Sequence, residues 1–147
     1  CANAIGQYIF GGLAHESHES LKAWYQSQRN YYRPLMVALR QGLLQEMPGG
    51  LIVTKPEAAI YMVIDFRNIC PPGFNAKDFV TYCAAEGKVH LAGQQYTLLL
   101  APMNEFYASQ ESTVTTQMRI AMVEPQDLIE KTPAILGALY HAYRGQY

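Results

Sequence analysis

The chain has 147 residues, half of them apolar, and a formal net charge of −1 at pH 7. This length suits one domain with a single core. The balanced charge, without a cluster of Lys and Arg, argues against a nucleic-acid-binding surface. No apolar run approaches the roughly 20 residues of a membrane helix, and no signal peptide is visible. We therefore expect a cytoplasmic globular protein with no nucleic-acid or membrane partner.

The cysteines are few and widely spaced, at Cys1, Cys70 and Cys83. An odd number without a CxxC pair favours reduced thiols over a disulfide framework or a zinc site. The chain begins at Cys1 with sequence typical of the middle of a domain. We therefore expect it to be a portion of a longer protein.

The N-terminal part predicts two helices. A short one is expected over Ala4 to Leu13, and the longest of the chain from about Ser17 to Leu44. His15 and His18 lie three residues apart, but no third ligand accompanies them, so we expect no metal. Pro34 lacks an amide inside the long helix and predicts a bend. One apolar stripe at helical spacing is expected to be core: Leu21, Trp24, Gln28, Tyr32, Leu35, Leu39 and Leu43.

After Gly50 the apolar period changes to two, which indicates strands. Strands are predicted over 51–56, 58–66 and 115–125. A hairpin turning near 92–94 is predicted to have a second, internal strand from Tyr96 to Ala101. Asp65 and Arg67 are expected to form an ion pair at the rim of the sheet.

The remaining elements are helices and one loop. Asn75 is expected to cap a helix that ends near Gly87. A loop follows Pro102 and carries Phe106 and Tyr107 as anchors. Thr132 and Pro133 predict a second helix start near the C-terminus, so the end is divided into two helices.

The order of elements favours an α+β fold. We expect a mainly antiparallel sheet of about three to five strands packed against helices, with a long N-terminal connecting helix. The whole of 1–147 is expected to form one domain.

Few residues suggest chemistry on their own. Phosphate-binding loops and a nucleophile elbow are absent. Arg119 stands in the middle of the strand over 115–125, where Met118, Ile120 and Met122 share one face and Gln117 and Arg119 the other. A cation there must reach water or meet an anion, because an unpaired buried charge is too costly. Spacing alone is compatible with an ordinary solvated arginine.

From Gln7 to Tyr143 the chain resembles the C-terminal part of a class I/II, fold-type I PLP-dependent aminotransferase of the aspartate-aminotransferase type. QSQRNYYRPLMVALRQGL resembles the helix that connects the cofactor domain to the small domain. KPEAAIYMVIDF resembles the family's P-x-G-A-F-Y strand, and TLLLAPMNEFY its V-x-V-x-P-G-x-x-F segment. QMRIAMVEP resembles the strand that carries the substrate-carboxylate arginine. The four segments occur in the family's order.

The resemblance implies a role for Arg119, which would bind the α-carboxylate of an amino acid or 2-oxo acid. Ile60 stands where the family has an aromatic residue and would line the substrate pocket. Ala58 and Met103 replace the usual glycines. Because of these departures, side-chain selectivity is not carried over from the family.

The resemblance also implies what the chain lacks. The family's lysine that forms the Schiff base with PLP precedes the stretch matched by Cys1 to Gln7. The isolated chain is therefore expected to be inactive, with no catalytic residue, no bound cofactor and no metal. Residues 1–16 would be a remnant on the cofactor-domain side, 17–46 the connecting helix and 47–147 the small-domain sandwich. The parent enzyme would use pyridoxal 5′-phosphate, contain an N-terminal cofactor domain and form a homodimer.

Two other functions remain open from the sequence. One is a stand-alone regulatory module that binds a small carboxylate or amino acid. The other is a PLP-dependent lyase or synthase of the same fold, since those enzymes share the arginine.

Overall fold

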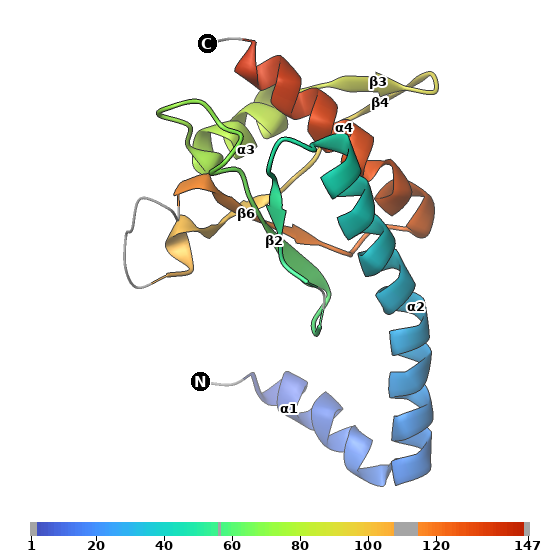
Figure 1. The fold of residues 1–147 in the computed structure, drawn as a ribbon. Helices are drawn as coiled ribbons and strands as arrows, with labels where there is room; N and C mark the ends of the chain where they lie inside the picture. The colour runs from blue at the N-terminus through green and yellow to red at the C-terminus, as the bar shows by residue number, and fades with distance from the viewer. Residues whose placement is uncertain (1–2, 56, 108–114, 146–147) are drawn as a thin grey trace. The chain divides into compact units, whose positions relative to one another are not determined.

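A computed structural model describes residues 3–55, 57–107 and 115–145. In these residues the chain forms four α-helices, a four-stranded antiparallel sheet and a separate two-stranded sheet (Figure 1). The predicted α+β class, the strand number and the long N-terminal helix are confirmed. The chain divides into two compact units, Cys1–Arg33 and Pro34–Tyr147. The single-domain organisation stays a prediction.

The first unit is helical. It contains α1 (Ala4–Gly11), a 3₁₀ turn η1 (Gly12–His15) and the first half of α2 (His18–Glu46). Asn3 caps α1, because its side-chain oxygen accepts hydrogen bonds from the amides of Ile5 and Gly6. His15 and His18 fall in different helices, and the described residues contain no cluster of three or more potential metal ligands.

Helix α2 continues through Pro34, so the predicted bend stays a prediction. Its apolar stripe is core only in the second half, where Leu35, Met36, Leu39 and Leu43 are buried. Trp24 remains 56% exposed, and Tyr25 and Tyr31 are about half exposed. The interpretation of the whole stripe as core is therefore wrong for its first half in this chain. Helical periodicity shows which side chains share a face, but not what covers that face.

The main sheet lies in the second unit. Its strands are β1 (Ile52–Val53), β2 (Tyr61–Asp65), β5 (Ala101–Pro102) and β6 (Gln117–Ala121), in the order β1-β2-β6-β5. Arg119 of β6 pairs with Val63 of β2 on one side and with Ala101 of β5 on the other. The two strands predicted over 58–66 and 115–125 are thus the central pair, each shorter than predicted.

One face of this sheet is buried. Met62, Ile64, Met118 and Ile120 are each at most 5% exposed. Helices α3 (Ala76–Ala85) and α4 (Gln126–Arg144) complete the core beside the sheet (Figure 1). Phe79 of α3 and Tyr140 and Tyr143 of α4 form a buried aromatic cluster with Phe66 and Phe74, which lie between β2 and α3. Asn75 caps α3 as predicted, by accepting a hydrogen bond from the Lys77 amide. The Tyr140 hydroxyl donates to the Ile69 carbonyl at 2.7 Å.

The C-terminal helix α4 is continuous, so the predicted division at Pro133 is wrong. Proline removes one amide donor, but the buried residues Ile129 and Leu136 on either side hold both halves of the helix against the core. Thr132 donates its hydroxyl to the Leu128 carbonyl instead of capping a new helix. The Pro133 ring also packs against α2, where a Cβ at Gly42 would lie 2.7 Å from its Cγ.

The hairpin consists of β3 (Val89–Leu91) and β4 (Gln94–Tyr96). Its two-residue turn is Ala92-Gly93, and both residues have positive φ, as the tightest hairpin turns require. The internal strand predicted from Tyr96 to Ala101 is wrong, because the chain leaves the hairpin after Tyr96 and joins the main sheet only at Ala101. Leu99, between the two, is 78% exposed. Within the described residues, no helix combines the length and apolarity needed to cross a membrane.

Candidate functional site

Arg119 occupies the open face of the main sheet. Side chains alternate along a strand, so Arg119 projects opposite the buried Met118 and Ile120, as predicted. Strand β6 lies between β2 and β5, which places the arginine in the interior of the sheet and not at its edge. It is half-buried, and no acidic side chain among the described residues forms an ion pair with it.

Two aromatic rings contact the guanidinium of Arg119. Its central carbon lies 5.1 Å from the centroid of the Tyr61 ring and 4.7 Å from that of Phe106. Both distances are within the roughly 6 Å of a cation–π interaction. Tyr61 begins β2, and Phe106 follows the 3₁₀ turn η2 (Met103–Glu105) after β5. The charge is thus stabilised by rings, while its N–H groups have no carboxylate partner in the described part of the chain.

A second polar group on this face is fully partnered. The Asp65 carboxylate accepts hydrogen bonds from the Arg67 Nε and backbone amide at 2.7 and 3.0 Å. It also accepts from the Thr116 hydroxyl at 2.7 Å and the Gln117 side-chain amide at 3.0 Å. The predicted pair between Asp65 and Arg67 exists, but its position at a solvated rim is wrong, since the Asp65 side chain is only 5% exposed. The donors Gln117, at the start of β6, and Thr116, just before it, complete a network that sequence spacing cannot show.

This network affects the charge of the site. Burial by itself raises the pKa of Asp65, but hydrogen bonds from Arg67, Thr116 and Gln117 outweigh it and hold the pKa below its usual value. The same contact raises the pKa of Arg67. Asp65 is therefore ionised at neutral pH, and its charge is balanced by Arg67. Arg119 has no such partner among the described residues, so it is the arginine of this face that suits an external anion.

Ile60, predicted to line a substrate pocket, lies immediately before β2 and is 41% exposed. Its carbonyl accepts a hydrogen bond from the Met122 amide at 2.7 Å. The preceding residue, Ala59, has a φ of 63°, which is uncommon and strained for a residue other than glycine. Strained backbone concentrates near functional sites. The pocket-lining role of Ile60 stays a prediction.

Two features of the site were not predicted from the sequence. Phe106 and Tyr107 were expected to be anchors, yet both are about half exposed, and Phe106 contacts Arg119 instead of the core. Asn104 contains a buried side-chain oxygen without a hydrogen-bond donor among the described residues. The aromatic residue in the P-x-x-x-F segment was the only available signal for the first feature. Nothing in the sequence marked the second.

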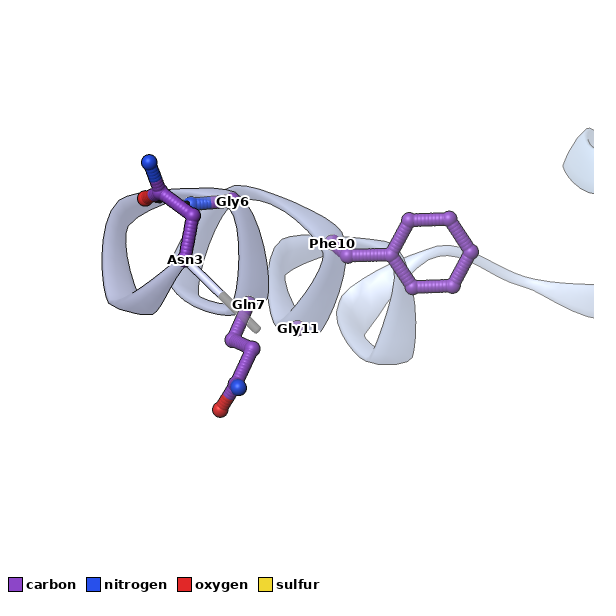
Figure 2. Close-up of a pocket in the computed structure, with 5 residues that line it drawn as sticks. All are labelled: Asn3, Gly6, Gln7, Phe10 and Gly11. Carbon is purple, nitrogen blue, oxygen red and sulfur yellow. Dashed lines mark hydrogen bonds between the residues drawn. The ribbon is translucent and has the colours of Figure 1, made fainter. Parts of the chain in front are cut away.

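The first unit has a shallow hollow on α1. Figure 2 shows Asn3, Gln7 and Phe10 projecting around it, with Gly6 and Gly11 leaving space between them. The Gly6 amide donates to the Asn3 side chain at 3.1 Å. No charged side chain lines this hollow, so it does not suit a carboxylate.

The lysines do not fit a covalent cofactor site. A Schiff-base lysine is placed in a desolvated pocket or beside another cation, so that its pKa falls. Lys131 shows the opposite: a hydrogen bond with the Tyr96 hydroxyl raises its pKa. Lys55 is 79% exposed and lies 4.0 Å from Glu57. The other three, Lys22, Lys77 and Lys88, are exposed. None of the five lysines thus shows such surroundings in this structure, and the absence of a PLP attachment point in this chain stays a prediction.

Sequence comparison gave no match, either to protein-family models or to curated proteins. Comparison with solved structures found aminotransferases that share the fold. Kynurenine aminotransferase from Pyrococcus horikoshii, in complex with PMP, matches 84% of this chain with a TM-score of 0.64 at 20% identity. The multiple substrate aminotransferase from Thermococcus profundus matches 80% with a TM-score of 0.60 at 18% identity. α-Aminoadipate aminotransferase from Thermus thermophilus, complexed with N-(5′-phosphopyridoxyl)-L-leucine, matches 86% with a TM-score of 0.59 at 20% identity.

These structures are much longer than this chain. The matched part is 27%, 26% and 30% of the three aminotransferases, respectively. The chain therefore has the fold of roughly a quarter of an aminotransferase, which agrees with the predicted resemblance to the C-terminal small domain. At these identities the match establishes the fold.

Proposed function

We propose that the chain is the C-terminal, substrate-closing domain of a PLP-dependent aminotransferase that transfers an amino group between an amino acid and a 2-oxo acid. The observation that carries this proposal is Arg119. Its guanidinium lies on the open face of the sheet, supported by aromatic rings and without an acidic partner among the described residues. The fold shared with three aminotransferases supports the same assignment.

The chemistry of Arg119 suits a substrate carboxylate. A guanidinium presents parallel N–H groups that match the two oxygens of a carboxylate, and these charge-assisted bonds are stronger than neutral ones. A carboxylate bound there fixes one end of the substrate, which orients its amino or oxo carbon for reaction elsewhere. This role is positioning and requires no covalent chemistry from this chain.

In this proposal, PLP would bind to the longer parent enzyme and not to the 147-residue chain. PLP would supply the electron sink for amino-group transfer, and the residues that hold it would belong to an N-terminal domain and not to this chain. The parent is proposed to act as a homodimer. Mixing the isolated chain with PLP, followed by borohydride reduction and mass spectrometry, should then leave no stoichiometric adduct. A single lysine modified in high yield would contradict this assignment.

A carboxylate titration of the 147-residue chain tests the role of Arg119. The backbone amide signals of β6 in a ¹⁵N-labelled sample should shift on addition of sodium pyruvate, with sodium chloride added in parallel to hold ionic strength constant. Arg119→Gln should abolish the response, because it removes the charge and the paired donors. Arg144→Gln, at the exposed end of α4, is the matched control and should bind as the wild type does. Equal pyruvate affinity in Arg119→Gln would refute the proposal.

The alternative of a stand-alone binding module differs in affinity. It requires amino-acid or carboxylate binding by the isolated chain at micromolar concentrations, because all of its contacts would be present. Half of a site contributes one ion pair on an open surface, so the aminotransferase proposal expects millimolar or weaker binding. Calorimetry on the isolated chain separates the two.

A further inference from the structure

The position of Phe106 has a consequence for how Arg119 can bind. Phe106 reaches the guanidinium from the β5 side of β6, whereas Tyr61 belongs to β2 on the other side. The central carbon of the guanidinium lies over both rings. Ring faces attract the flat face of a guanidinium and leave its N–H edge free. A carboxylate must then approach along this edge.

The segment that carries Phe106 is attached to the same strand as Arg119. The Tyr107 hydroxyl donates to the Gln117 side-chain oxygen at 3.1 Å. Gln117 lies two residues before Arg119 on the same face of β6, and its amide group donates to Asp65 at 3.0 Å. The Phe106 amide closes the turn by donating to the Met103 carbonyl at 2.9 Å. Phe106 is thus held in place by its own backbone hydrogen bond to Met103 and by the side-chain hydrogen bond of the next residue, Tyr107, to Gln117.

The exposure of Phe106 argues that its ring serves a local purpose. The side chain is 55% exposed, so it contributes far less to the core than a buried phenylalanine does. A long arginine side chain on an open sheet face has several rotamers of similar energy, and binding in one of them costs conformational entropy. Contact with a fixed ring reduces this cost before a ligand arrives.

We propose that Phe106 is a positioning residue for Arg119, holding the guanidinium in the orientation in which its N–H edge donates hydrogen bonds to a substrate carboxylate. The inference rests on the proposed role of Arg119 and extends it. Tyr61 forms the second wall of the same arrangement, and the contact from Tyr107 to Gln117 keeps Phe106 in place.

The matched variants are Phe106→Leu and Phe106→Tyr in the full 147-residue chain. Leucine keeps apolar bulk and removes the ring, whereas tyrosine keeps the ring. The readouts are the Arg119 Nε–H chemical shift without ligand, which a nearby ring displaces, and the dissociation constant for acetate in a titration at constant ionic strength. A residue that only stabilises the fold would change unfolding without changing either readout.

Phe106→Leu should move the Arg119 Nε–H signal toward that of Arg144, and weaken acetate binding about two- to fivefold, the loss expected for one exposed cation–π contact. Phe106→Tyr keeps the ring, so its Arg119 Nε–H signal and its dissociation constant for acetate should match those of the wild type. Tyr107→Phe, which removes only the hydroxyl donated to Gln117, should give a smaller change in the same direction.

The outcomes separate this inference from the proposed function. If Arg119→Gln abolishes acetate binding while Phe106→Leu changes neither the shift nor the dissociation constant, the positioning role is wrong and the role of Arg119 stands. If the wild-type signal shows the ring displacement but does not respond to acetate, the carboxylate role fails, and the positioning role fails with it.

Discussion

Replacing Asp65 by asparagine tests whether the carboxylate network holds β2 and β6 together. The carboxylate accepts four hydrogen bonds, two from Arg67 and one each from Thr116 and Gln117. An asparagine keeps one acceptor oxygen and presents an NH₂ group where the second oxygen was. That group would face donors from Arg67 or Gln117 and could not accept from them.

The expected cost follows from the exposure of each partner. The Asp65 side chain is almost buried, so donors that lose their bond to it are poorly reached by water. Each buried donor left without an acceptor destabilises the folded state by about 1–3 kcal/mol. Arg67 is 40% exposed and can regain water, which reduces its share. We therefore expect Asp65→Asn to lower the free energy of unfolding by about 2–3 kcal/mol. Asp127→Asn is the control: its carboxylate is 70% exposed and 3.6 Å from Lys131, so its loss should cost less than about 0.5 kcal/mol.

Urea unfolding followed by far-ultraviolet circular dichroism measures both variants at pH 7 and at lower pH. The pKa of Asp65 is lowered in the folded state, so its contribution is complete above the unfolded-state pKa and is lost as the pH falls through the folded-state pKa. The difference between wild type and Asp65→Asn should therefore shrink below about pH 4. A pH 7 difference under about 0.5 kcal/mol, or one that stays constant down to pH 3, would refute the reasoning.

Gly42→Ala should lower the free energy of unfolding by about 1–3 kcal/mol, because the new Cβ would lie 2.7 Å from the Pro133 ring. In Gly11→Ala, where no atom lies within 4 Å, stability should be unchanged or higher; equal urea midpoints for the two variants would contradict the packing of α2 on α4. Burial raises the pKa of Cys83 to about 12, so only about one thiol in ten thousand is ionised at pH 8. Peptide mapping after iodoacetamide treatment should find Cys83 unmodified in the folded chain while the half-buried Cys70 reacts; equal rates would show that α3 opens readily.

Local patterns in the sequence predicted the local features of the fold well. Alternation placed Met118 and Ile120 inside and Arg119 outside, because a side chain on a strand has only two faces to choose from. Asn75 was recognisable as a cap, since its side chain satisfies an amide two residues away. These features depend on neighbours within a few residues.

Features set by distant parts of the chain were not predictable in the same way. Pro133 suggested a helix start, yet packing on both sides of it keeps α4 continuous. Asp65 suggested a surface pair, yet donors 51 and 52 residues away enclose it. The contact of Phe106 with Arg119 likewise depends on β5 lying beside β6.

The central claim is that Arg119 binds the substrate carboxylate of an aminotransferase. The direct test is Arg119→Lys in the full-length parent enzyme, with equilibrium binding of its amino-acid substrate and of PLP measured separately. Lysine keeps the charge but loses the paired donors, so substrate binding should weaken about 30- to 1,000-fold, equivalent to about 2–4 kcal/mol, while PLP affinity stays within about twofold. Unchanged substrate affinity, or an equal loss for PLP and substrate, would contradict the account.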